Sequence, residues 1–326
     1  MKTPTTPSKS RGSVIVSIVS DAGIAVVKIV AAIFSGSSAM TSEAIHSTVD
    51  AFNSVFLLVG ERRSKRAPDP EHPFGYGREI YFWTLLVAVS MFAGGGALSF
   101  YEGVRHLASP KPLEVSTWNY VVLAAAAGFE TWATVSAYRE HRAVKRERDL
   151  GLWAAFRASK DLTTFIVLFE NGAALVGVGI AAAGIALSHA LGSSYPDGVA
   201  SLLIGIVLLV VAWFLIRETK GLLIGEGVDP RADKEMRAIT VAQADVEEVI
   251  NLLTLQTGPK QVLVLMDVRF RAELSTAQVV TSVGNIERSL RERFPDVRRI
   301  FVEASSLTRR EQAEARVVNV VREQAP

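Results

Sequence analysis

The sequence contains no cysteine and only five histidines among its 326 residues. The lack of cysteine excludes disulfides and thiolate metal sites, so any metal site must use histidine, carboxylate or amide ligands. A phosphate-binding loop of the GxxxxGK[ST] type is also missing, which argues against nucleotide-driven activity. No catalytic constellation stands out beyond candidate metal ligands, and we therefore expect neither an enzyme nor a prosthetic group.

Long apolar runs dominate the chain instead. Hydrophobic residues make up 49% of the sequence, and its mean hydropathy is positive. A helix needs about 20 mostly apolar residues to cross the hydrocarbon core of a bilayer, and we expect six such helices. The expected spans are Val14–Ser35, Ala39–Gly60, Ile80–Gly103, Thr117–Tyr138, Leu162–Ala186 and Asp197–Ile216.

Lysine and arginine are unevenly distributed among the loops between these spans. The loops that begin at Arg62 and Arg139 are strongly basic, whereas the opposite loops hold only Arg105 and Lys111. Basic loops tend to stay in the cytoplasm, so we expect both termini there. The alternative interpretation of the basic loops, a nucleic-acid surface, is disfavoured by the flanking spans. Residues 1–12 lack an arginine-rich transit pattern, and this favours a bacterial inner (cell) membrane.

After the last span, the sequence changes from long apolar runs to shorter segments of mixed polar and apolar residues. We expect helices over Arg231–Gln243 and Ser275–Phe294 and strands over Val249–Gln256, Gln261–Phe270 and Val297–Ala304. This order predicts a small cytoplasmic α+β domain of the ferredoxin-like type. The expected boundaries are 1–12 for a disordered tail, 13–217 for the six-helix membrane domain, 218–230 for a linker, 231–306 for the α+β domain and 307–326 for a charged tail.

A polar stripe runs along the second expected span. Glu43, His46, Asp50 and Asn53 follow spacings of three, four and three residues, which places them on one face of a helix. Ionisable groups at bilayer depth are expensive and usually mark an ion path or a proton relay. A histidine and a carboxylate one turn apart are also suitable ligands for a divalent cation such as zinc.

The fifth expected span supplies a further carboxylate, Glu170, followed by Asn171. Its alternative interpretation is a helix-packing hydrogen bond, but a mid-span carboxylate more often serves transport. If the second and fifth helices pack together, Glu170 approaches His46 and Asp50. Three side-chain ligands and a water or weak fourth group would complete an open tetrahedral site.

Other polar residues are weaker candidates for a role in transport or metal binding. Asp21 shares the first span with Lys28, and the two residues are expected to pair with each other or with neighbours; Asp21 is also a candidate residue of the transport path. Asp197 opens the sixth span, where capping of a helix N-terminus and a place on the transport path are both open. The loop PDPEHPFGYGRE is either a rigid Pro/Gly connector or a second metal site. Candidate ligands in this loop are Asp69, Glu71 and His72.

Several segments, in order, resemble the cation diffusion facilitators, and within that family the branch that contains zinc transporter nine. They include SGSSAMTSEAIHSTVDAFNS, RRSKRAPDPEHPFGYGRE, SKDLTTFIVLFENGAALVG, DGVASLLIGIVLL and RETKGLLIGEGVDP. The resemblance covers Ser13 to Ser306. It implies a homodimer in the lipid bilayer that exports zinc or a related divalent cation in exchange for protons by alternating access, with the α+β domain serving dimerisation.

The resemblance also implies a central site of four ligands, two from the second span and two from the fifth. His46 and Asp50 match the first pair, and Glu170 matches the second member of the other pair. The first member falls on Ile166, which cannot bind a metal. The missing ligand is then Asn53, Asn171 or water.

Two further features follow from the resemblance. The loop site of the family matches Asp69 and His72, but its third position is Tyr76, so that site is degraded or relies on Glu71. Arg78 matches a basic residue in a charge contact between subunits, with Glu226 as the candidate partner. No histidine follows His189, so a conventional cytoplasmic zinc cluster is not expected.

Two alternatives to zinc export stay open at this point. The same fold would suit export of manganese, iron(II) or cobalt, because ligand type separates these metals from zinc poorly. A membrane scaffold or regulator that does not transport is the second alternative, motivated by Ile166 in a ligand position.

Overall fold

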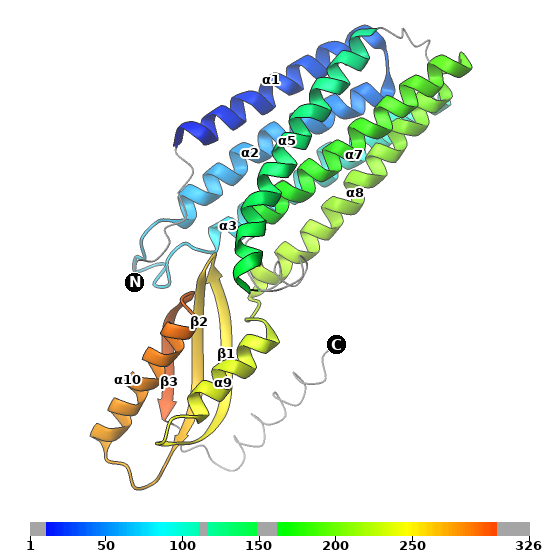
Figure 1. The fold of residues 1–326 in the computed structure, drawn as a ribbon. Helices are drawn as coiled ribbons and strands as arrows, with labels where there is room; N and C mark the ends of the chain where they lie inside the picture. Colours follow the sequence, from blue (N-terminus) through cyan, green and yellow to red (C-terminus); the bar gives the residue numbers. More distant parts are fainter. Residues whose placement is uncertain (1–10, 111–116, 149–161, 305–326) are drawn as a thin grey trace. The chain divides into compact units, whose positions relative to one another are not determined.

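The computed structural model describes residues 11–110, 117–148 and 162–304, and the chain divides into two compact units. The helical unit holds the long helices up to Lys220 (Figure 1). The second unit comprises residues 67–78 and the chain from Gly221 onward. Residues 67–78, which we expected within the membrane domain, therefore belong to the unit that contains the sheet.

Each apolar run expected to span the membrane is helical. The helices are α1 (Arg11–Ser35), α2 (Ser38–Ser64), α3 (Glu79–Ser90), η1 (Met91–Ala97), α4 (Leu98–Ala108), α5 (Thr117–Arg148), α7 (Leu162–Leu191) and α8 (Tyr195–Ile224). The third run is continuous through α3, η1 and α4, with a π-helical stretch in the middle. That stretch contains Gly94, Gly95 and Gly96, and such irregular turns recur at functional sites.

Four of these segments are long and apolar enough to cross a membrane: Ile18–Ser35, Glu79–Ala108, Ile166–Leu191 and Tyr195–Ile224. The helices α2 and α5 do not meet the same criterion over their described residues. In α2 the polar stripe lowers the hydropathy. The structure thus supports a multi-pass helical membrane protein, and the full count of six spans stays a prediction.

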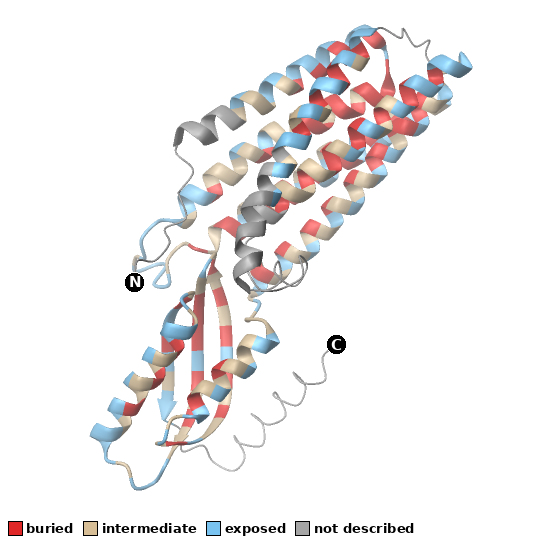
Figure 2. Cartoon of the chain, viewed as in Figure 1, coloured by how far each residue is buried: buried red, intermediate tan, exposed pale blue. Residues whose placement is uncertain are grey.

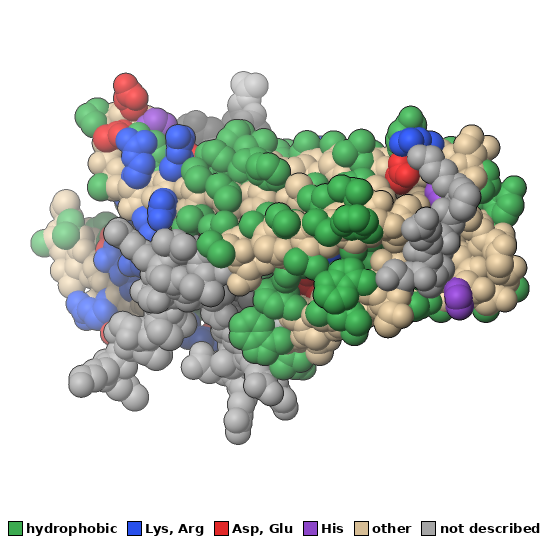
Figure 3. Space-filling view, turned by 90° about the horizontal axis from the view of Figure 1, so that it is seen from above, with side chains coloured by type: hydrophobic (Ala, Val, Ile, Leu, Met, Phe, Trp, Pro, Cys, Tyr) green, Lys and Arg blue, Asp and Glu red, His purple; other side chains and the backbone are tan. Residues whose placement is uncertain are grey.

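Hydrophobic side chains cover the outside of the helical unit as well as its interior. Figure 3 shows them gathered on the exposed face of the helices. Phe34 of α1 is 77% exposed and Val210 of α8 is 61% exposed, as expected for side chains that contact lipid. The buried residues lie where the helices face one another (Figure 2).

Two glycines allow the backbones of α4 and α8 to come close together. A Cβ atom on Gly103 would lie 2.6 Å from the backbone nitrogen of Leu202, and one on Gly205 would lie 2.5 Å from that of Phe100. Small residues are favoured at such helix contacts in membranes because apolar burial gives no net driving force there.

The sheet domain has helices on one face of a mixed sheet. Its elements are α9 (Pro230–Val241), β1 (Val246–Gly258), β2 (Gln261–Phe270), α10 (Thr276–Arg293) and β3 (Val297–Ala304). The strand order is β1-β2-β3, with β1 antiparallel and β3 parallel to β2. Met236 of α9 and Ile286 of α10 pack on alternate residues of β2, including Val264 and Met266.

Two sequence expectations need correction here. The sheet in the described part of the chain has three strands, one fewer than the ferredoxin-like βαββαβ order requires, although the small α+β domain itself is present. The expected linker 218–230 is helical in its first half, because α8 continues to Ile224. The chain then turns at Gly225, whose φ of 125° suits glycine.

Candidate metal centre

Helix α2 carries the polar stripe into the middle of the helical unit. It contacts α1, α3, η1, α4 and α7. Both ends of the stripe are buried: Glu43 and Asn53 are each fully inaccessible to solvent. The polar face of α2 therefore points toward other helices. Exposure of these polar side chains to lipid would cost free energy.

His46 and Asp50 are adjacent on this face. The distance from His46 Nδ1 to Asp50 Oδ1 is 3.4 Å, and the His46 side chain is fully buried. Neither ring nitrogen of His46 has a hydrogen-bond partner among the described residues, and the same holds for Asp50 Oδ1. Buried polar atoms nearly always have hydrogen bonds in proteins, so three buried atoms without one at the same place indicate a site for a ligand.

Glu170 of α7 lies near this pair but is held by a different residue. Asn53 donates a hydrogen bond from Nδ2 to Glu170 Oε1 over 2.7 Å, and Ser90 donates to Asn53 Oδ1. The amide of Asn53 thus links α2 to α7 and to α3. Asp50 and Glu170 are close enough for electrostatic interaction between their carboxyl groups.

The predicted ligand set is only partly assembled in this conformation. Within the described ranges, no three histidine, aspartate or glutamate side chains are close enough to hold a metal ion together. Ile166 lies one turn before Glu170 on α7 and is fully buried. Asn171 is half-buried, and as the next residue along α7 it projects about 100° away from Glu170.

Sequence reasoning left the partner of Lys28 open between Asp21 and neighbouring residues. Its Nζ lies 2.8 Å from Oε2 of Glu43, and both side chains are fully buried. Asp21 does not share this contact: it accepts a hydrogen bond of 2.7 Å from Ser54 Oγ of α2. A lysine in an apolar run needs a carboxylate nearby, but the sequence alone did not distinguish Asp21 from Glu43.

Asp197 acts as a cap, but for a different helix from the one that it opens. It accepts hydrogen bonds from Ser37 Oγ at 2.6 Å and from the backbone nitrogens of Ser38 and Ala39. These groups form the start of α2, so a carboxylate from α8 satisfies donors that α2 leaves free. His106 Nε2 of α4 lies 3.9 Å from the same carboxylate.

The loop between α2 and α3 is organised by hydrogen bonds among its own side chains. Tyr76 donates to Asp69 Oδ2 over 2.6 Å, and the His72 backbone nitrogen donates to Asp69 Oδ1 over 2.8 Å. The Tyr76 hydroxyl therefore holds the pKa of Asp69 below its ordinary value. Glu71 is exposed. The three predicted loop ligands do not form a metal cluster in this conformation.

The loop also contacts the sheet within the second unit. Arg299 of β3 donates to the Pro73 carbonyl over 3.1 Å and lies 5.3 Å from the centre of the Phe74 ring. Arg78 donates to the Leu223 carbonyl. Glu226 lies near the same turn, with its Oε2 3.4 Å from where a Cβ of Gly221 would be. The predicted charge contact of Arg78 with Glu226 across a subunit interface stays a prediction.

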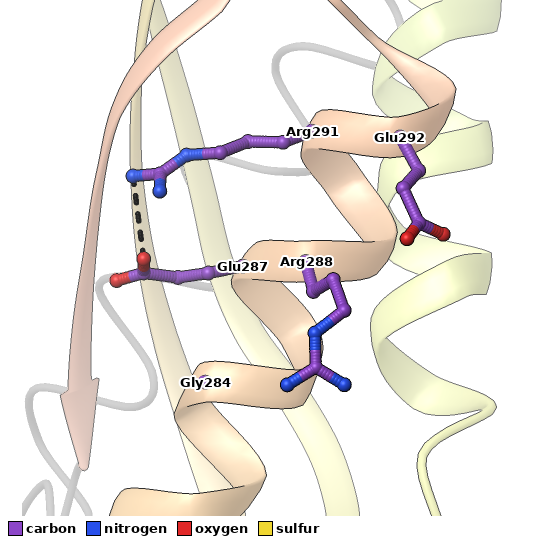
Figure 4. A pocket seen from close by; sticks show the side chains of 5 residues that line it. All are labelled: Gly284, Glu287, Arg288, Arg291 and Glu292. Carbon is purple, nitrogen blue, oxygen red and sulfur yellow. Dashed lines mark ion pairs between the residues drawn. The ribbon is translucent and has the colours of Figure 1, made fainter. Parts of the chain in front are cut away.

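A shallow cavity in the second unit does not resemble a metal site. It lies on the surface of α10 (Figure 4), where Glu287 pairs with Arg291 at 3.2 Å. The lining residues are Gly284, Glu287, Arg288, Arg291 and Glu292. Its side chains are largely exposed and charged, in contrast to the buried stripe on α2.

The helical unit matches a known family over most of its length. The model of the cation efflux transmembrane domain matches residues 14–224. The chain belongs to the cation efflux family. Members of this family are transporters and not enzymes, and the chain is accordingly an integral multi-pass membrane protein.

Relatives of this cation efflux protein include zinc and metal transporters. It is 32% identical over 255 residues to the mitochondrial proton-coupled zinc antiporters SLC30A9 of Xenopus laevis and Homo sapiens, a match that covers 78% of this chain and 44% of each relative. It is 28% identical over 276 residues to the cation-efflux pump FieF of Klebsiella pneumoniae (strain 342), covering 82% of this chain and 84% of the pump. The chain thus spans less than half the length of the zinc antiporters that it matches.

Proposed function

We propose that this protein exports divalent metal cations, with zinc as the preferred cargo, in exchange for protons. The observation that carries the proposal is His46, whose two ring nitrogens are buried without a hydrogen-bond partner among the described residues, beside an equally unpaired oxygen of Asp50. Nitrogen and carboxylate ligands together suit zinc better than magnesium or calcium. The relatives named for zinc antiport and cation efflux support the same cargo class.

Proton coupling follows from the chemistry of these ligands. A metal binds neutral imidazole and ionised carboxylate, so the cation and protons compete for His46, Asp50 and Glu170. Histidine is suited to this exchange because its unperturbed pKa of about 6.5 is near physiological pH. Release of the metal followed by protonation would neutralise the site and allow the empty carrier to return.

The cation-bound state requires a rearrangement of Glu170. In the present conformation its Oε1 accepts the Asn53 hydrogen bond, and it does not complete a three-residue cluster with His46 and Asp50. We propose that Glu170 moves toward this pair as α7 shifts between inward-open and outward-open states. Asn53, Asn171 or water then supplies the fourth ligand in place of Ile166.

The setting of the proposed transporter follows from the loops and the relatives. We propose six spans with the basic loops on the cytoplasmic side, so that both termini lie in the cytoplasm. A bacterial inner membrane fits the match to the Klebsiella pump. We propose a homodimer, in which the sheet domain and the charge contact of Arg78 with Glu226 serve association.

Transport by purified protein in sealed vesicles tests the proposal. With an imposed pH gradient, we expect zinc uptake together with proton movement in the opposite direction. His46→Ala and Asp50→Ala should abolish uptake, whereas His189→Ala, which removes an exposed histidine from the end of α7, should leave it unchanged. Uptake that survives Asp50→Ala would exclude the proposed site.

Competition separates the other cargoes. Manganese, iron(II) or cobalt added in excess should slow zinc uptake only weakly if zinc is the preferred cargo, because His46 and two carboxylates rank these metals by affinity. Strong inhibition by one of them would assign that metal instead. Absence of any metal-dependent proton flux in the wild-type protein would support a non-transporting scaffold or regulator.

A further inference from the structure

Lys28 of α1 and Glu43 of α2 form an ion pair inside the helical unit, and we call it the Lys28–Glu43 pair. The distance from Lys28 Nζ to Glu43 Oε2 is 2.8 Å, and both side chains are 0% exposed. Breaking such a pair leaves a buried charge, but an apolar pair of similar volume is often at least as stable. Stability alone is therefore a weak reason for placing two charges at this depth.

Only half of the Glu43 carboxylate is used by the pair. Its second oxygen, Oε1, is buried and has no hydrogen-bond partner among the residues that the structure describes. This oxygen faces Gly177 of α7, where an added Cβ would clash with it. The glycine thus makes room for a charged, unpaired oxygen between α2 and α7.

The position of Glu43 relates it to the metal centre. It lies three residues before His46 on the same face of α2, toward the start of that helix. Four buried polar atoms without hydrogen-bond partners among the described residues therefore line one face of α2: Glu43 Oε1, His46 Nδ1, His46 Nε2 and Asp50 Oδ1. In the proposed orientation, the start of α2 is the non-cytoplasmic end.

Lys28 has a second carboxylate within electrostatic range. Glu130 of α5 is 7% exposed, and its charge acts on the Lys28 ammonium. Helix α5 contacts both α1 and α7. Glu130 is thus a second buried carboxylate on a helix that packs against the helix of Lys28.

We propose that Glu43 is a transient ligand for the cation on its way from His46 and Asp50 to the non-cytoplasmic side, and that Lys28 controls access to it. With Lys28 in place, Glu43 is neutralised and the exit is closed. When the ammonium turns toward Glu130, both Glu43 oxygens are free for the divalent cation. This inference rests on the proposed export function and adds a specific exit route to it.

Variants of the pair test this proposal in three measurements: equilibrium zinc binding in nanodiscs, the initial rate of zinc transport in vesicles, and thermal unfolding. Glu43→Gln should lower the transport rate by about tenfold while zinc affinity at the central site changes by less than about threefold. Lys28→Arg, which keeps the charge, should retain most of the transport rate. Transport by Glu43→Gln at the wild-type rate would overturn the proposal.

A variant in which the two charges are exchanged distinguishes a role of Glu43 as an exit ligand from a purely structural role of the Lys28–Glu43 pair. In Lys28→Glu/Glu43→Lys the ion pair can form again, so thermal stability should recover, but a lysine at position 43 cannot bind the cation and transport should stay low. Recovery of both stability and transport would show that the pair is only structural and would overturn the proposal. If Glu43→Gln does not fold, Gly177→Ala replaces it, with slower transport expected because the methyl group occupies the space beside Glu43 Oε1.

Asp50→Asn distinguishes failure of this proposal from failure of the proposed function. It should abolish zinc binding if His46 and Asp50 form the central site. If Asp50→Asn abolishes binding and Glu43→Gln transports normally, only the exit route is wrong. If Asp50→Asn leaves binding unchanged, the central site itself is wrong.

Discussion

Asn53 on α2 donates a hydrogen bond of 2.7 Å to Glu170 on α7, two residues that are 117 positions apart in the chain. This contact joins the helix that carries His46 and Asp50 to the helix that carries the remaining candidate ligand. It uses one of the two oxygens of the Glu170 carboxylate. Asn53 therefore positions the Glu170 carboxylate beside the helix that carries His46 and Asp50.

Removal of this hydrogen bond should alter metal binding. Asn53→Ala leaves the Glu170 carboxylate without its donor, and a buried hydrogen bond to a charged group contributes about 1.5–3 kcal/mol. Residues that orient metal ligands typically change affinity by about 10- to 100-fold, and we expect weaker zinc binding by about tenfold. Equilibrium binding in nanodiscs measures this change.

Ser90→Ala is the matched control for Asn53→Ala. It removes the hydrogen bond that Ser90 donates to Asn53 but leaves the Asn53–Glu170 contact in place. We expect a change in zinc affinity of less than about threefold. Equal effects of the two substitutions would show that Asn53 acts through helix packing and not through Glu170.

A ligand introduced at Ile166 should complete the metal centre. This residue is fully buried one turn before Glu170, so Ile166→His places an imidazole on the inward face of α7. We expect tighter zinc binding by about tenfold or more and slower turnover, because release becomes the difficult step. Binding and initial transport rates are measured side by side.

The volume-conserving change Ile166→Leu controls for packing. Such swaps usually cost less than about 1.5 kcal/mol, so binding should stay near the wild-type value. If Ile166→His and Ile166→Leu bind zinc equally well, position 166 does not face the metal.

Asp197→Asn should loosen the first turn of α2. The carboxylate accepts hydrogen bonds from Ser37, Ser38 and Ala39, and an amide cannot accept all of them. Loss of a helix cap typically costs about 1 kcal/mol. Hydrogen exchange should therefore accelerate at the amides of Ser38 and Ala39.

Asp229→Ala provides the control, because Asp229 caps α9 in the sheet domain through the backbone nitrogen of Arg231. It should accelerate exchange in α9 and leave α2 unchanged. Faster exchange at the start of α2 in both variants would indicate a general loss of stability and not a specific cap.

The loop between α2 and α3 should depend on pH through Asp69. Its hydrogen bond from Tyr76 lowers the pKa of the Asp69 carboxyl in the folded protein. A lowered pKa stabilises the loop above the unfolded pKa of about 3.9, and the stabilisation is lost as pH falls through the folded value. Protection of the His72 amide from exchange should follow this dependence after correction for intrinsic rates.

Tyr76→Phe should raise the pKa of Asp69 and shift the loss of protection to higher pH. Tyr195→Phe, at an exposed tyrosine that opens α8, should have no such effect. A pH profile that is the same in Tyr76→Phe and the wild type would rule out the Asp69–Tyr76 hydrogen bond as its cause.

Helical periodicity explains which part of the metal centre could be predicted from the sequence. The spacing of His46 and Asp50 fixes them on one face of any helix that contains them, so their proximity needed no tertiary information. The bounds of β2 and β3 were predicted correctly because Gly-Pro and polar turns flank apolar runs of strand length. In contrast, the end of α8 was missed because a helix continues into polar sequence after it leaves the apolar core.

Contacts between helices required the tertiary structure. Lys28 pairs with Glu43 and not with Asp21, and Asp197 caps α2 instead of its own helix. Both outcomes depend on which faces of separate helices meet. The sequence by itself determined the membrane character of the chain and the polar face of α2, since both arise from hydropathy and local spacing. Only the packing of α1, α7 and α8 around α2 decided which ligands are free, which are held by Asn53, and which charges are paired.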